Sequence, residues 1–232
     1  MARNSKRSRH FNQAHMAFAL ALPLSFGQPG EEACGDTTEP TADDLLALTQ
    51  NCDPLPGVGY FSNDYGGSNT IPMCELDGAI WFRADMDIDC DGGTEAECKA
   101  DPYYLPETSA NDSNGDPLDA SHLPFSVLPL NSNGFSMSEW GLRLGSTTAV
   151  IYQGQLLYMP LGDRGPSGTV GEASYAAAVD LGIPPSPISG GVPSGVTYIF
   201  FDGSDAVVSP IESESAAASV GSTQAADLLL AN

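Results

Sequence analysis

Glycine and proline divide this chain into short segments. Among its 232 residues are 25 glycines and 18 prolines, while charged residues make up only 16%. Because both residues interrupt regular elements, this composition favours short strands joined by many turns over a bundle of long helices. The length, together with a hydrophobic content of 41%, is sufficient for one globular domain with its own core.

The first 27 residues are typical of a signal peptide. Four basic side chains fall within the first ten positions, and an apolar stretch follows over residues 16–26, which is too short to span a membrane comfortably. Ser25 and Gly27 supply small residues at the −3 and −1 positions, so we expect cleavage after Gly27. The leader therefore predicts a secreted, extracellular protein that makes no membrane contact in its mature form.

The chain beyond this leader is strongly acidic. Only four basic residues remain there against all 30 Asp and Glu residues, which leaves a formal net charge of −26 for residues 28–232. Such a surface repels nucleic acid and anionic membranes, and it attracts polycations and divalent metal ions. We therefore expect no nucleic-acid partner, although solubility or adaptation to salt accounts for the same charge equally well.

Five cysteines follow the basic residues of the leader, and export permits disulfides. Cys90 and Cys98 close a short loop and form the first expected pair. Cys34, Cys52 and Cys74 lie close together in sequence, and one of them is left over in a monomer, which is the state we expect. The sequence does not say which one.

The apolar pattern predicts one core domain with less regular ends. A capping residue and an acidic first turn predict a short helix from Thr41 to about Thr49, within an N-terminal linker region at 28–70. The core domain is expected over 71–202. Residues 203–232 are rich in Ser, Ala and Glu without a periodic apolar face, so a mobile tail is predicted there.

Within the core, short apolar runs predict strands, one hairpin and one helix. The strands are expected at 79–83, 124–128 and 196–201, the hairpin at 147–152 and 155–159 around Gln153-Gly154, and the helix at 173–181. This order favours a mainly β protein with a few short helices. A single barrel-like domain fits the short, closely spaced strands, with a double-psi-like barrel as one option, although the sequence does not give the strand order.

The first candidate site is Gly162-Asp163-Arg164-Gly165-Pro166 followed by Gly171-Glu172-Ala173-Ser174. Asp163 follows a predicted strand and Glu172 begins the predicted helix, so the loop between them can hold two carboxylates across a cleft. Glycosidic hydrolysis needs such a pair, one to protonate the leaving oxygen and one to activate water or attack the sugar. A turn aspartate and a glutamate that complements a helix dipole explain the same spacing.

The second candidate is the acidic run from Asp85 to Gly92. Residues 87–92 match the opening of an EF-hand loop, but the twelfth position is Cys98 instead of Glu, so an EF-hand is disfavoured and a calcium site of another kind stays open. In a strand, Asp85, Asp87 and Asp89 share one face and repel one another unless a metal ion or a substrate ammonium group lies among them. An acidic, solvent-facing strand end is the simpler interpretation.

Other site classes find little support. His122 is the only histidine after the leader, and no Gly-x-Ser-x-Gly segment or phosphate-binding glycine motif occurs, so we expect no cofactor and no catalytic metal. Tyr103, Tyr104 and Trp140 are candidate platforms for stacking on sugars, although aromatic side chains more often pack in cores and loops.

Several short blocks follow one another along residues 71–202: Ile71–Cys74, Gly78–Gly92 with its A-D-M-D-I-D-C-D-G run, Leu118–Ser121 before Leu123–Phe125, Gly162-Asp163, Gly171–Ser174 and Val196–Ile199. In residues and order, these blocks resemble the fungal-type chitosanases of glycoside hydrolase family 75. The resemblance does not extend to the N-terminal part through about residue 70 or to the residues after 203.

The resemblance implies endo-hydrolysis of chitosan, the β-1,4-linked glucosamine polymer, with inversion at the anomeric carbon. It implies Glu172 as the general acid and Asp163 as the general base. One point opposes these roles, because a helix N-terminus lowers the pKa of a carboxylate whereas a general acid needs it raised. Arg164 is a cation beside a site for a cationic polymer, so its expected role is to orient a carboxylate and not to bind the substrate. The candidate substrate-binding residues are Asp85, Asp87, Asp89, Tyr158 and Ser174.

Two other functions stay open. One is a non-catalytic extracellular module that binds calcium or a polycationic glycan through the acidic loop. The other is a β-glycanase that acts on a different polymer, such as a cell-wall glycan.

Overall fold

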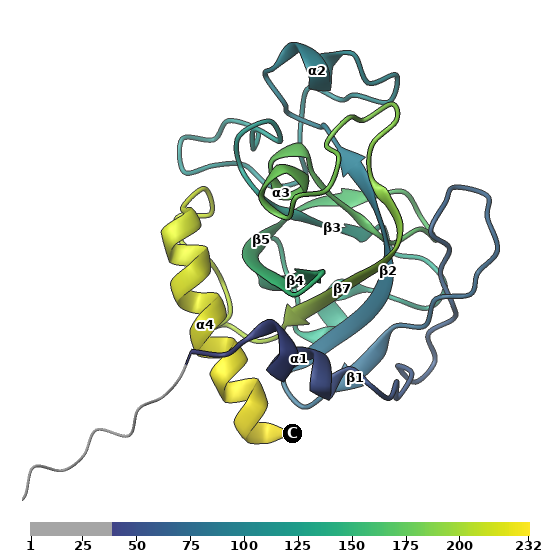
Figure 1. Ribbon diagram of the computed structural model, residues 1–232, viewed down its shortest axis with the longest axis vertical. Coiled ribbons are helices and arrows are strands. Elements are labelled where there is room, and N and C mark those ends of the chain that lie inside the picture. The colour runs from purple at the N-terminus through teal and green to yellow at the C-terminus, as the bar shows by residue number, and fades with distance from the viewer. Residues whose placement is uncertain (1–38) are drawn as a thin grey trace, which may run out of the picture. The chain divides into compact units, whose positions relative to one another are not determined.

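The computed structural model describes residues 39–232 (Figure 1). The predicted signal peptide, the residues up to 38 and Cys34 lie outside the described residues. The elements are α1 (Ala42–Leu48), β1 (Cys74–Leu76), β2 (Ala79–Asp89), α2 (Ala96–Lys99), β3 (Ser126–Pro129), η1 (Met137–Trp140), β4 (Thr147–Tyr152), β5 (Gln155–Gly165), β6 (Glu172–Ser174), α3 (Tyr175–Asp180), β7 (Val192–Phe201) and α4 (Glu214–Ala231).

Six strands close into a barrel. The hydrogen-bonded order β2-β6-β3-β5-β4-β7 returns to β2, because β7 also pairs with β2. β1 pairs with the beginning of β2, and β6 pairs with its end. Two pairings are parallel, β2 with β6 and β3 with β5. The prediction of a mainly β, single barrel-like domain is confirmed, and the double-psi assignment stays a prediction.

Local sequence signals located the core elements correctly. Each strand and helix predicted within 71–202 has a counterpart, although β2 and β5 run six residues further than expected. Thr41 and Asp44 form the capping box that begins α1. Gln153 and Gly154 both have positive φ, 48° and 80°, as a tight hairpin turn between β4 and β5 requires.

The barrel interior is filled by alternating side chains of its strands. On β2, Ile80, Phe82, Ala84 and Met86 belong to the main core cluster. The Phe82 ring stacks on Tyr198 and Phe200 of β7, with centroid distances of 5.0 and 5.7 Å. Because successive strand side chains point to opposite faces, Asp85, Asp87 and Asp89 lie on the outer face of the same strand.

The core begins before residue 71, contrary to the prediction. Leu55 and Phe61 are almost fully buried in the same cluster as the barrel interior. Phe61 exchanges backbone hydrogen bonds with Ile71, which closes the intervening Gly-, Ser- and Asn-rich loop. The turn composition of this segment therefore hid two anchoring apolar residues.

The predicted mobile tail is wrong for most of its length, because residues 214–231 form helix α4 against the outside of β4 and β5 (Figure 1). The buried face of α4 consists of Ala217, Gly221, Ala225 and Leu228. Gly221 lies directly against the ring of Tyr158, where a Cβ atom has no room. Small residues make this contact, and therefore the sequence shows no strong apolar stripe.

Two disulfides are present among the described residues. Cys90–Cys98 is the predicted pair, and Cys52–Cys74 resolves part of the ambiguity that the sequence left open. The second bond attaches the segment after α1 to β1. Within residues 39–232, no helix combines the length and apolar character needed to cross a membrane.

Candidate active site

Asp163 lies within β5, not in a turn after it. Its Cα atom is paired with Val127 of β3, and the side chain is only 5% exposed. Three donors hold its Oδ1 atom: the Ser109 N–H at 2.9 Å, the Ser109 hydroxyl at 2.5 Å and the Arg164 N–H at 2.6 Å. The described residues offer Oδ2 no hydrogen bond, so this carboxylate is oriented with one oxygen available.

Ser109 is positioned by the backbone of the residue that follows it. The N–H of the next residue, Ala110, donates to the carbonyl of Gly162 at 3.0 Å, so this loop runs beside the end of β5. Nothing in the sequence indicates Ser109, because a serine in a polar loop carries no signal until the position of the loop is known.

Glu172 begins β6 and does not begin a helix. Its Cα atom is the parallel partner of Asp87 in β2, and α3 starts only at Tyr175, capped by the Ser174 hydroxyl. The side chain extends over Gly165 of β5, where a Cβ atom would collide with Oε2. Gly165 is therefore required by the close approach of this carboxylate.

The two carboxylates lie on the same side of the sheet. β3 lies between β6 and β5, and the Glu172 carboxylate crosses it to reach Gly165. Asp163 and Gly165 are two residues apart on β5 and therefore share one face, separated by roughly 7 Å along the strand. The predicted pair is thus brought together across one strand.

Burial and neighbouring charges raise the pKa of Glu172 to about 7. Loss of solvent is the largest cause, and the negative charges of Asp87 and Asp163 follow. A general acid needs a raised pKa. The expected lowering by a helix dipole does not apply, because Glu172 lies in a strand and not at a helix N-terminus.

The acidic residues around this pair form two groups, in each of which one oxygen per carboxylate lies within 4.8 Å of the others. The first group is Asp89, Asp91 and Asp163, and the second is Asp64, Asp85 and Asp87. Burial raises the pKa of Asp91 to about 6 and that of Asp85 to about 8. Either group has the oxygen ligands of a hard cation.

Three residues of these surroundings were not predicted as site residues. Asp91 belongs to the acidic run but was not chosen, whereas Asp64 and Asp101 lie in loops with no local motif. Asp101 raises the pKa of both Glu172 and Asp91 by its charge, which places its loop at the border of the site. Tyr103, in the same loop, is 86% exposed, and its role as a stacking platform stays a prediction.

Two predicted substrate-binding residues lie elsewhere. Ser174 is fully buried, and its hydroxyl donates to the Leu123 carbonyl and accepts from the Phe125 and Ala177 N–H groups, so it caps α3 and is closed to a ligand. Tyr158 packs under α4, because its ring points to the outside of β5.

Arg164 does not orient a carboxylate through its guanidinium group. That group donates to the Pro129 carbonyl at 3.1 Å and to Asn131 Oδ1 at 2.8 Å. Within residues 39–232, His122 alone forms ion pairs with acidic side chains. The contribution of Arg164 to the pair is its backbone N–H, which the sequence could not reveal.

Comparison with known proteins identifies a family. The family described as fungal chitosanase of glycosyl hydrolase group 75 matches residues 86–227, a range that includes most of α4. The chain is 30% identical to an endo-chitosanase of Aspergillus fumigatus, over 67% of this chain and 72% of that one. It is 29% identical to endo-chitosanase B of Aspergillus oryzae, over 70% and 76% of the two chains.

Other similarities are more partial. Endo-chitosanase C of Aspergillus oryzae is 36% identical over 56% of this chain but only 33% of its own length. Among solved structures, the Streptomyces papain inhibitor (SPI) covers 55% of this chain and 99% of its own, at 18% identity and a TM-score of 0.33, a similarity too low to bear on fold or function.

Proposed function

Because the chain belongs to the fungal chitosanases of glycosyl hydrolase group 75, we propose that it is a glycoside hydrolase that cleaves chitosan at internal β-1,4 bonds with inversion. Asp163 and Glu172 are the catalytic residues of this proposal. The observation that carries it is a half-buried glutamate with a pKa raised to about 7, on the same face as an aspartate whose carboxylate is held by three donors.

The environments of the two carboxylates support different roles. Glu172, which stays protonated to about neutral pH, donates its proton to the glycosidic oxygen as the bond from that oxygen to C1 breaks. Asp163 accepts a proton from the water whose oxygen attacks C1 from the opposite side. The three donors fix the Asp163 carboxylate through Oδ1, and the described residues leave Oδ2 without a hydrogen bond.

Inversion requires room for a water molecule between the sugar and the base. Inverting enzymes hold the two carboxyl groups roughly 6.5–9.5 Å apart, so that water fits between the sugar and the base. The Glu172 carboxylate lies above Gly165, and Gly165 is roughly 7 Å along β5 from Asp163.

The surrounding acids suit a cationic polymer. Asp87 is exposed and can meet the ammonium groups of glucosamine, with Asp101 nearby, whereas burial raises the pKa of Asp89 well above its usual range and Asp85 is only 5% exposed. Coulomb attraction to these carboxylates weakens with salt, so the apparent affinity for chitosan falls as ionic strength rises.

The test measures reducing ends released from chitosan, chitin and cellulose by the wild-type protein and by Asp163→Asn and Glu172→Gln variants. We expect activity on chitosan that falls about 100-fold or more in each variant. Glu139→Gln, an exposed acid on η1, is the matched control and should retain activity. Activity that survives in both site variants would contradict the assignment of Asp163 and Glu172 as the catalytic residues.

Inversion and export need separate measurements. Proton NMR of the first products from glucosamine oligomers should show the α-anomer at the new reducing end, because the β bond is inverted. Secretion, with cleavage after Gly27 and a monomeric mature protein, is tested by N-terminal sequencing and light scattering of the exported chain.

A further inference from the structure

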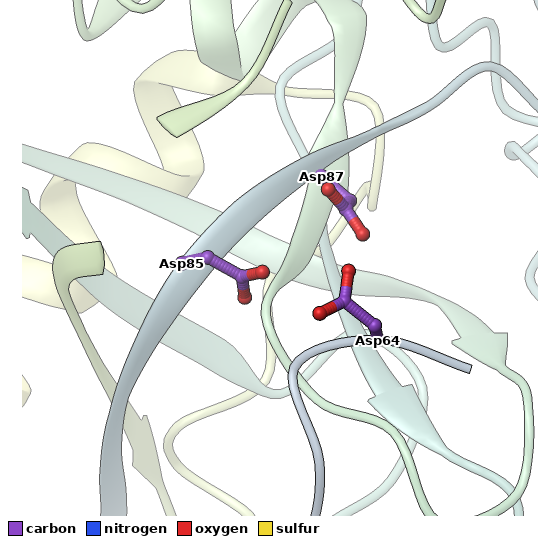
Figure 2. Close-up of side chains that lie close together, drawn as sticks. All are labelled: Asp64, Asp85 and Asp87. Carbon is purple, nitrogen blue, oxygen red and sulfur yellow. The ribbon is translucent and has the colours of Figure 1, made fainter. Parts of the chain in front are cut away.

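Asp64, Asp85 and Asp87 form a three-aspartate cluster at the edge of the proposed active site. One oxygen of each carboxylate lies within 4.8 Å of the other two, and Figure 2 shows the three groups pointing toward one another. Asp85 and Asp87 come from the outer face of β2. Asp64 comes from the loop that follows Phe61, more than 20 residues earlier in the sequence.

The loop that carries Asp64 is anchored at its N-terminal end. Phe61 is fully buried, and Ser62 exchanges backbone hydrogen bonds with Gly168 and Val170, each at 3.0 Å. The strand Glu172–Ser174 begins two residues after Val170. The position of Asp64 is therefore coupled to the segment that leads into Glu172.

Asp85 is the member of the cluster that most needs a partner. The residue is only 5% exposed, and its Oδ1 atom is buried without a hydrogen bond from any described residue. The carboxylate lies against Gly171, where a Cβ atom would collide with Oδ1. Leaving a buried acceptor unpaired costs free energy, and a paired one is the rule in folded proteins.

The described part of the chain supplies no cation for this cluster. Within residues 39–232, ion pairs are formed by His122 alone, with Glu95 and Asp119 as its partners. The three carboxylates also repel one another, and Asp87 and Asp64 are among the charges that act on Asp85. A compensating positive charge has to come from outside the protein.

We propose that the three-aspartate cluster binds one divalent cation of the calcium type, which joins the Asp64 loop to β2. Calcium takes six to eight oxygen ligands at 2.3–2.6 Å, so oxygens up to about 4.8 Å apart can share one ion. Magnesium requires shorter bonds in a stricter octahedron. Asp64 and Asp87 are exposed, which leaves space for water to complete the coordination.

An ion suits this cluster better than the ammonium group of a sugar. A sugar ring cannot follow its amine to a side chain as buried as Asp85, whereas a small ion can lose water and reach it. Asp87 is also one of the proposed substrate-binding residues, and Asp64 is not. Asp64 is therefore the diagnostic residue, and binding is measured without reference to activity.

The experiment titrates calcium chloride into chelator-treated protein by calorimetry and follows thermal unfolding with and without the ion. We expect one site with a dissociation constant of about 0.1–1 mM, and a Tm higher by about 3 °C or more at 10 mM calcium. Magnesium chloride and sodium chloride at matched ionic strength should have smaller effects.

Variants locate the ion. Asp64→Asn and Asp85→Asn should each weaken calcium binding at least tenfold, and the exposed Asp64 variant carries little risk for folding. Asp91→Asn changes the neighbouring acidic group and should bind calcium like the wild type.

Four results would overturn the proposal. The first is the absence of a saturable site, and the second is unchanged affinity in Asp64→Asn. The third is loss of calcium binding in Asp91→Asn, which would place the ion beside Asp163. The fourth is that Asp64→Asn loses affinity for a glucosamine oligomer and not for calcium, which would make the cluster a substrate subsite. Each result leaves the chitosan assay to judge the proposed hydrolase by itself.

Discussion

Glu172 derives its acid character from neighbours that are distant in sequence. The two charges that raise its pKa most, Asp87 and Asp163, come from β2 and β5, and desolvation by burial contributes more than either. The Gly-Glu-Ala-Ser block indicated this residue, but the local pattern predicted that it begins a helix. The hydroxyl of Ser174 caps that helix, and so the dipole acts two residues further along the chain.

The pKa of Glu172 leads to a pH prediction. The proposed hydrolysis needs the protonated form of Glu172, so kcat/KM for a soluble glucosamine oligomer should decrease as pH rises through about 7. The negative charge of Asp91 contributes to the raised pKa. Asp91→Asn should therefore move the alkaline limb of the profile to lower pH.

The matched control for this shift is Glu139→Gln, which should leave the limb in place because that exposed residue does not act on Glu172. An alkaline limb that stays fixed in Asp91→Asn, or moves upward, would contradict the assignment of Glu172 as the acid.

At the level of elements, the strands were easier to predict than the last helix. Apolar runs such as Ala79–Phe82 and Thr147–Tyr152 directly predict buried strands, because barrel strands need large apolar side chains. Helix α4 packs through Ala217, Gly221 and Ala225, which are as common in flexible segments as in close contacts. Only the contact of Gly221 with Tyr158 shows that this segment is a packed helix and not a flexible tail.

The close contact between Gly221 and Tyr158 predicts that a larger side chain at position 221 destabilises the protein. Gly221→Val places a branched side chain against the Tyr158 ring and should destabilise the protein by about 1–3 kcal/mol, measured by urea unfolding. Ser219→Val, which is exposed on the same helix, should change stability much less. Equal losses in both variants would show that helix propensity, not the contact with β5, determines the effect.

The whole molecule concentrates acidic groups around one region of the barrel. Glu172, Asp91 and Asp85 have pKa values raised to about 7, 6 and 8, chiefly by burial. In the unfolded chain these groups lose their protons near pH 4. Between about pH 4 and 8 the folded state therefore binds more protons than the unfolded state, and stability decreases as pH rises.

The corresponding measurement is the Tm of the calcium-free protein from pH 5 to pH 8, which should fall steadily. Repulsion within a chain of net charge −22 acts in the same direction, but salt screens it. A decline that persists in 0.5 M sodium chloride belongs to the buried groups. A Tm that is constant or rises with pH would exclude this account.

The sequence by itself determined the strand pattern, the Cys90–Cys98 bond and the family blocks, and it supplied the pair Asp163 and Glu172 that we propose as catalytic. These features depend on residues that are close together or on short recognisable motifs. Only the tertiary structure decided that the barrel closes, that Ser109 donates to Asp163 and that Asp64 lies beside Asp85. The physical reason is that burial and charge at a site are sums over neighbours, and neighbours are assigned when β2, β3, β5 and β6 meet.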